Sequence, residues 1–187
     1  MVFLISNYLA DLVAYSLNKE ALILSKFIGS PQILQLIGHL VAAEDDGKCS
    51  VYNLGLEYAA GGSLDDLINQ RKKLPEDELK GYLRMMLTGL SCIHSKGFVH
   101  CDFKPSNVLV FPSQHGKPDL KIADEDVYER TETKVEFCVE TRKRDKNSDH
   151  TKGILQKCFQ RDPKQRWSAE MLLQHPYLVE ENEITEL

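Results

Sequence analysis

The sequence lacks the cysteine pattern and the basic charge that mark several large classes of protein. Its five cysteines are odd in number and include no Cys-x-x-Cys pair, which argues against a disulfide framework or zinc site and favours free thiols in a reducing compartment. The formal net charge is −5, whereas a nucleic-acid-binding domain normally carries a basic face. We therefore expect no nucleic-acid partner and a cytoplasmic location, with the nucleus as the alternative.

The first 15 residues also lack the charge pattern of a leader or a membrane span. They are apolar but interrupted by Asn7 and Asp11, with no basic segment and no clear cleavage site of small residues. We interpret them as a buried helix and expect no membrane association. The chain has 187 residues, of which 42% are apolar and 27% charged, enough for one domain with a hydrophobic core.

Apolar periodicity predicts an alternation of helices and strands. Residues 9–27 repeat apolar side chains at helical spacing, and Gly29 follows that helix. Ser63 is suited to cap a second helix after a flexible turn, and a long third helix begins near Pro75 and ends at Gly97. Strands are expected at residues 33–40, 48–58, 108–110 and 120–124.

The densest group of chemically useful side chains lies in residues 100–110, between two apolar runs. Asp102, Lys104 and Asn107 can line one side of a short loop that Pro105 stiffens. A carboxylate that accepts a hydroxyl proton, an ammonium that neutralises phosphate charge and an amide that ligates a metal ion together suit phosphoryl transfer. Asp, Pro, Ser and Asn are also ordinary turn residues, but several fixed offsets coincide here, which disfavours a plain turn.

A second pattern with many fixed positions, C-F-x-x-D-P-x-x-R-W-S-A, begins at Cys158 and continues to L-x-H-P. Together with H-C-D-F-K-P-S-N at residues 100–107, it resembles the catalytic loop and the end of eukaryotic serine/threonine protein kinases. The resemblance covers residues 17–110 and 153–179. Within this family, the sequence is similar to the plant mitogen-activated protein kinase kinase kinases, but it looks truncated and internally deleted.

The resemblance implies an α+β, protein kinase-like fold with a mostly helical C-terminal lobe and a partial N-terminal β lobe. It makes residues 1–179 one incomplete kinase-like domain, followed by an acidic tail. The expected parts are an N-lobe fragment at 1–58, a C-lobe at 59–179 with an activation segment deleted near 125–152, and the tail at 180–187.

The resemblance also implies a site that binds ATP and Mg²⁺. Asp102 would orient the substrate hydroxyl and Lys104 would contact the γ-phosphate, while Asn107 and Asp124 would hold Mg²⁺. The adenine and ribose would be bound by a hinge region at Glu57, Tyr58, Ala59, Ser63 and Asp66. Glu20 would be the glutamate of the helix that pairs with a lysine on the preceding strand, and an exposed helix glutamate is the alternative.

Several parts of the family pattern are missing. Residues 1–18 contain neither the Gly-rich loop nor the strand lysine, and Glu125 and Asp126 replace the family's Phe-Gly after Asp124. Residues 126–152 are dense in charge and are expected to form a loop or a partly disordered linker, with no A-P-E motif. Because that motif supplies the family partner of Arg166, this arginine must find another partner or stay hydrated.

Two functions follow from this pattern. One is a serine/threonine kinase of a signalling cascade with impaired activity, acting on a protein substrate or signalling partner. The other is a non-catalytic, pseudokinase-like binding module or the remnant of a shortened gene. Since the large lobe would lose central helices, we also expect exposed apolar faces there, and poor solubility or a need for a partner. The sequence leaves the oligomeric state open.

Overall fold

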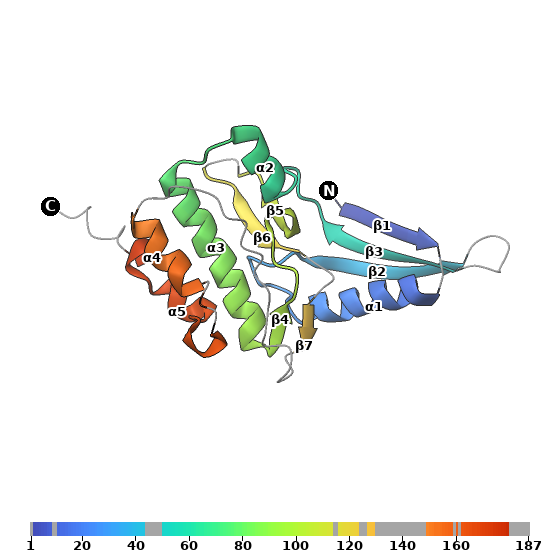
Figure 1. Cartoon of the computed structure of the whole chain (residues 1–187). Helices are drawn as coiled ribbons and strands as arrows, with labels where there is room; N and C mark the ends of the chain where they lie inside the picture. The colour runs from blue at the N-terminus through green and yellow to red at the C-terminus, as the bar shows by residue number, and fades with distance from the viewer. Residues whose placement is uncertain are drawn as a thin grey trace.

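The computed structural model describes residues 2–8, 11–43, 50–113, 116–123, 127–129, 149–158, 160 and 162–179. Figure 1 shows a small sheet with one helix at one end of the molecule and a group of helices around a long central helix at the other. The fold is therefore of the α+β class. Among the described residues, no helix is long and apolar enough to cross a membrane.

The small sheet has three antiparallel strands in the order β1-β3-β2. They are β1 (Val2–Tyr8), β2 (Leu36–Ala43) and β3 (Ser50–Glu57), with α1 (Asp11–Ser25) between the first two along the chain. The prediction of a helix in the first residues is wrong for 2–8, because β1 pairs along its whole length with β3, from Val2 opposite Glu57 to Tyr8 opposite Val51. That pairing is distant in sequence, so local periodicity does not reveal it.

Helix α1 packs on the sheet through a buried face. Leu17, Ala21 and Leu24 recur at helical spacing and are at most 5% exposed. Glu20 lies on the same face and is only 6% exposed, so the alternative of a solvent-exposed glutamate is wrong. The core around α1 continues into the other half of the molecule, where Phe27 packs edge-on against Phe98 at 5.8 Å between ring centres.

The helical half is built around α3 (Glu76–Ser95), which ends as predicted before Gly97 in a left-handed conformation (φ 80°). The short α2 (Leu64–Arg71) precedes it, and α4 (Asp149–Cys158), α5 (Ala169–Leu173) and α6 (Pro176–Val179) follow it in the chain. A buried cluster that includes Leu87, Ile154 and Leu172 joins α3 to α4 and α5.

Two small two-stranded sheets lie between the halves. β5 (Val108–Phe111) pairs with β6 (Asp119–Ile122), and β4 (Phe98–His100) pairs with β7 (Val127–Glu129). The prediction that residues 126–152 form only a loop is therefore wrong at both ends, because β7 and the first turn of α4 fall inside it. Short strands and helix ends in charged sequence depend on tertiary pairing, which propensity does not show.

Among the described residues, the apolar side chains that are at least half exposed lie mostly in β2, in α1 and in the turn after it, while Met171 and Val179 are exposed in the large half. The expected exposure of apolar faces in the large lobe stays a prediction. Among the described side chains, those at least half exposed are Leu22, Ile28, Ile37, Leu40, Val41 and Val179. Five of these six precede residue 58. The described helices of the large half instead cover one another through the cluster around α3.

Candidate active site

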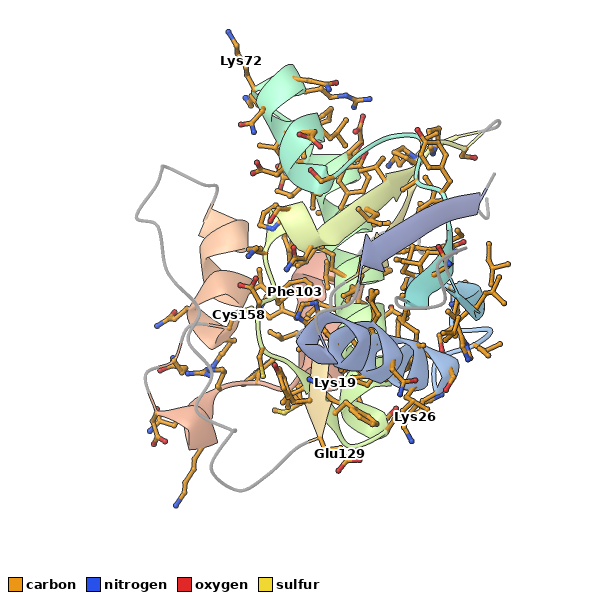
Figure 2. The ribbon with its side chains drawn as sticks, turned by 90° about the vertical axis from the view of Figure 1, so that its right-hand side faces the viewer. Lys19, Lys26, Lys72, Phe103, Glu129 and Cys158 are labelled. Carbon is orange, nitrogen blue, oxygen red and sulfur yellow. The ribbon has the colours of Figure 1, made fainter. Side chains whose placement is uncertain are left out.

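The loop after β4 begins with a buried anchor. His100, the last residue of β4, is 4% exposed and packs edge-on against Phe103, with 5.5 Å between ring centres. Phe103 in turn contacts two of the three buried clusters found among the described residues, and it lies centrally in Figure 2. The loop between these aromatic rings is therefore fixed to the core, while Asp102 between them points its carboxylate to partly exposed surface.

The structure brings together the three polar residues that the loop pattern singled out. The Lys104 ammonium is paired with Oδ2 of Asp102. Asn107 Nδ2 donates to the same oxygen at 3.2 Å and to the Asp102 carbonyl at 2.9 Å. A 3-10 turn (Pro105–Asn107), with proline at its first position, returns the chain so that these groups meet.

The electrostatics of this group favour an ionised carboxylate. The hydrogen bond from Lys104 has the largest effect and lowers the pKa of Asp102 below its ordinary value. Burial opposes it as the second-largest effect, while the charge of Lys104 and the bond from Asn107 lower the pKa further. The carboxylate is 42% exposed, so a hydroxyl group from solvent or from another molecule can approach it. An ionised, accessible carboxylate is suited to accept a proton.

The end of β6 lies against the loop at residues 100–107. Ala123 N donates to the Asn107 carbonyl at 2.9 Å, which holds the end of β6 against the loop. Asp124, the second predicted Mg²⁺ ligand, lies outside the described residues, as do Glu125 and Asp126. Its role stays a prediction. Within the described residues, no group of three His, Cys, Asp or Glu side chains forms a metal site.

Glu57, predicted to contact adenine through its backbone, has internal partners. Its N–H donates to the Gln35 carbonyl at 3.1 Å, and its Oε1 accepts from Gln35 N at 2.8 Å. Both carboxylate oxygens also accept from Lys121 at 2.7 Å. Sequence reasoning missed Gln35 and Lys121, because no local pattern signals contacts between residues 22 and 64 positions apart.

Tyr58 and Ala59 follow Glu57 on the way into α2. Tyr58 is 40% exposed, and the Ala59 carbonyl accepts from Gly62 N at 3.3 Å in a turn. The turn lies against β5, because Gly61 N donates to the Val110 carbonyl at 3.0 Å. A Cβ at Gly61 would lie 2.7 Å from that carbonyl oxygen, so only glycine permits this approach.

Ser63 and Asp66, predicted near a ribose, form the N-terminal cap of α2. Ser63 Oγ accepts from Asp66 N at 3.1 Å, and Asp66 Oδ2 accepts from Ser63 N at 3.0 Å. This is a complete capping box, which confirms the predicted N-cap. The hydrogen bonds from Ser63 lower the pKa of Asp66. A ribose contact would have to compete with these bonds.

The described residues supply groups that can act on the transferred γ-phosphoryl group, but the strand before α1 lacks the lysine that the family uses to contact the α- and β-phosphates. Asp102, Lys104 and Asn107 supply the proton acceptor, the cation and the amide that phosphoryl transfer needs. The strand before α1 contains no lysine to pair with the buried Glu20. The neighbouring Lys19 instead lies 3.5 Å from the ring centre of Tyr128, and Figure 2 shows it beside the strand that ends at Glu129.

Arg166, whose expected partner is missing from the sequence, has found another one. Its Nε and Nη2 donate to the Gln160 carbonyl at 3.3 and 3.1 Å. The guanidinium thus ties the end of α4 to the turn before α5. Ser168 caps α5 as predicted, accepting from Met171 N at 3.2 Å.

Comparison with known sequences decides the family. Residues 10–141 match the protein kinase domain family. The chain belongs to this family. It is a serine/threonine kinase-like domain, and the α+β halves and the loop between them are consistent with a partial kinase fold.

Among the curated relatives are three mitogen-activated protein kinase kinase kinases of Arabidopsis thaliana. Number 17 is 29% identical over 230 aligned positions, covering 90% of this chain and 60% of that protein. Number 20 is 26% identical over 233 positions, covering 89% and 66%, and number 18 is 39% identical over 113 positions, covering 58% and 32%. The chain thus spans less than two thirds of the length of these relatives. The first two alignments are longer than the chain itself, so they include positions at which this chain has no residue.

Proposed function

We propose that this chain is a protein serine/threonine kinase of a signalling cascade whose catalytic loop is built and whose activity is low. The observation that supports it is the arrangement of Lys104 and Asn107 around one carboxylate oxygen of Asp102. ATP with Mg²⁺, when bound, would supply the phosphoryl group. The protein substrate would supply a serine or threonine hydroxyl.

In this proposal Asp102 accepts the proton of the substrate hydroxyl as its oxygen attacks phosphorus. The lowered pKa keeps Asp102 ionised at neutral pH, so it can accept a proton without first losing one. Lys104, 50% exposed, can turn from Asp102 toward a phosphate oxygen, because a lysine head on a flexible stem reorients easily. Asn107 holds the loop through its amide nitrogen, which fixes the direction of its oxygen toward a cation.

Low activity follows from the missing positioning groups. Phosphoryl transfer relies on positioning and charge stabilisation. Each lost contact to the phosphates therefore lowers the transfer rate, and the losses multiply. The strand before α1 has no lysine, and Glu125 replaces the family's Phe beside Asp124. The alignments that exceed the chain length support the absence of residues relative to the relatives, and the missing A-P-E motif is the reason for proposing the deletion near residues 125–152.

A non-catalytic binding module is the second candidate. The observation that favours it is the combination of a lysine-free β1 with a Glu57 N–H already bonded to Gln35. A domain of this kind would present the kinase fold to a protein partner without turnover. Nucleotide binding separates the two candidates.

The experiment is a thermal melt with and without ATP and Mg²⁺, followed by phosphotransfer to a serine/threonine peptide. The kinase proposal expects a metal-dependent rise in melting temperature that Asp124→Ala abolishes. It also expects Asp102→Asn to lower the transfer rate by about 10² to 10⁴-fold. Asp65→Asn is the matched control, because Asp65 is an exposed aspartate on α2 that accepts only from Asn69 in its own helix. No shift at millimolar nucleotide and no transfer would favour the binding module.

A further inference from the structure

Lys19 of α1 lies unusually close to an aromatic ring of a strand that is distant in the sequence. Its Nζ is 3.5 Å from the ring centre of Tyr128, whereas the five other lysine–ring pairs between described residues are separated by 4.8 to 5.8 Å. The face of an aromatic ring attracts a cation, and the attraction grows when water is partly excluded. Both side chains are half-buried, so this contact is partly shielded from water.

Tyr128 belongs to the strand pair that leads into the loop of the candidate site. In this pair, Tyr128 of β7 lies opposite Val99 of β4, and Val127 lies opposite His100. Asp102 follows two residues after His100. The pair has only three residues in each strand, and an isolated two-stranded sheet is marginally stable in water. Its position therefore depends on the elements that pack against β7.

Helix α1 is the element that packs against β7 in two ways. Side chains of a strand alternate between its two faces, so Val127 and Tyr128 point to opposite faces of β7. Val127 is buried in the cluster that also contains Leu17 and Ala21 of α1. Tyr128 receives Lys19 of the same helix, and Figure 2 shows Lys19 beside this strand. One attachment is apolar and the other is a cation over a ring.

We propose that Lys19 is a positioning residue, which holds α1 against β7 through Tyr128 and thereby fixes β4 and the start of the Asp102 loop. In the kinase family, a lysine on the strand before this helix fixes the helix by an ion pair with its glutamate. The strand β1 has no lysine, and Lys19 supplies a tie from the helix itself, one residue before Glu20. The benefit to catalysis rests on the proposed kinase function, whereas the contact is testable without turnover.

The contact also fixes the rotation of α1 about its own axis. Leu17, Ala21 and Leu24 bury one face of the helix, but apolar burial is non-directional. A cation over a ring has a preferred place, so the helix keeps one rotation as long as Lys19 stays over its ring. Because successive residues of a helix are about 100° apart, this rotation also sets the direction of Glu20.

Proton NMR of the full chain tests the contact directly. Protons held over the face of an aromatic ring are shielded, so the ε-methylene protons of Lys19 should resonate upfield of those of other lysines. Tyr128→Leu should remove this shift, while Tyr128→Phe keeps the ring and should preserve it. A wild-type Lys19 signal at the ordinary lysine position overturns the proposal, and so does a shift that persists in Tyr128→Leu.

Amide exchange tests whether the contact holds the strand pair. Lys19→Met keeps the apolar stem without the charge and should speed exchange in residues 98–100 and 127–129 by about 5- to 30-fold. Lys19→Arg should restore the wild-type rates, because a guanidinium also stacks on aromatic faces. Lys80→Met is the matched control: Lys80 also lies over a tyrosine, Tyr177, but at 5.1 Å and between α3 and α6. It should leave these amides unchanged.

Three exchange results would overturn the proposal. They are wild-type rates in Lys19→Met, an equal acceleration in Lys80→Met, and a Lys19→Arg variant that exchanges as fast as Lys19→Met. The last result would mean that the stem of the side chain matters rather than its charge.

Phosphotransfer separates this inference from the proposed function. In an active wild type, Lys19→Met should lower the transfer rate by a similar factor and Lys19→Arg should restore most of it. An unchanged rate in Lys19→Met would overturn the positioning role. A wild type without transfer would contradict the proposed function, while the NMR and exchange results would still decide whether Lys19 holds α1 to β7.

Discussion

The ammonium of Lys121 lies 2.7 Å from both carboxylate oxygens of Glu57, joining the end of β3 to β6. The pair is well covered, with side chains only 16% and 22% exposed. Gln35 completes the group by donating its backbone N–H to Glu57 while its side chain bonds Gly29, Ser30 and Ile33. One carboxylate therefore ties the loop after α1, the end of the small sheet and the strand that leads to Asp124.

Lys121→Met should lower the free energy of unfolding by about 1 to 3 kcal/mol, because it leaves a half-buried carboxylate without its cation. Urea unfolding measures this change. Arg71→Met is the control: Arg71 is also 2.7 Å from a carboxylate, that of Glu78, but is 46% exposed. Its loss should cost less than about 1 kcal/mol. Equal losses of unfolding free energy in the two variants would mean that burial of the Glu57–Lys121 ion pair adds nothing to its stabilising effect.

Two glycines in α3 should respond to alanine with opposite signs. A Cβ at Gly89 would lie 2.7 Å from Ile122 Cδ1 and 3.0 Å from the Gln32 carbonyl, whereas nothing lies within 4 Å of one at Gly81. Gly81→Ala should stabilise by up to about 1 kcal/mol through helix propensity. Gly89→Ala should destabilise by about 1 kcal/mol net, since overpacking of a buried contact outweighs the same propensity gain.

Chemical denaturation of both variants tests this contrast. Ile122→Val removes the clashing methyl group, so Gly89→Ala should cost less in that background than in the wild type. A stabilising Gly89→Ala in the wild-type background would show that α3 and β6 approach each other less closely than the structure has them.

Two buried tyrosines should respond to phenylalanine with opposite signs. Tyr82 OH donates to Glu78 Oε2 at 3.0 Å, while the buried Tyr177 OH has no hydrogen-bond partner among the described residues. Tyr82→Phe should cost about 1 kcal/mol, the worth of a hydrogen bond. Tyr177→Phe should stabilise by about 1 kcal/mol, because it removes a desolvated hydroxyl. Thermal melts of the two variants at neutral pH measure the pair. A destabilised Tyr177→Phe would reveal a partner for that hydroxyl.

Alkaline pH should weaken the fold through Tyr82. Burial, aided by the bond to Glu78, raises the pKa of Tyr82 from 10.0 to about 12. A raised pKa means that the folded state binds the proton more tightly, so this contribution is complete below pH 10 and is lost as pH rises toward 12. Ultraviolet titration should show one tyrosine ionising after the others, and Tyr82→Phe should remove that late step. A wild type without a late step contradicts the prediction.

The pKa of Asp102 should depend on Lys104. The lysine hydrogen bond is the largest cause that holds it below 3.8, so Lys104→Met should raise it toward that value. Because the folded pKa is depressed, the favourable effect of the ionised form is present above 3.8 and fades as pH falls further. Carbon-13 NMR titration of the carboxyl group measures the shift. Lys117→Met serves as control, as Lys117 bonds the Asp77 carbonyl instead. An unchanged Asp102 pKa in Lys104→Met would show that the two groups are apart in solution.

The loop at residues 100–110 and helix α3 could be predicted from the sequence because their signals are local. Asp102, Lys104 and Asn107 are five positions apart at most, and a turn held by Pro105 and Asn107 brings them together without help from distant residues. The apolar stripe of α3 and the Ser63 cap are equally local. These patterns also placed the chain in its family before any contact was known.

What the tertiary structure decided are the pairings between distant segments. Residues 2–8 form a strand because they pair with β3, some fifty residues later in the chain. Glu20 is buried because the face of α1 that carries it packs against the sheet. Lys121 finds Glu57, and the apolar side chains of β2 are left at an edge, for the same reason. The periodicity of a segment determines which face can be buried, but only the packing of its neighbours determines which face is.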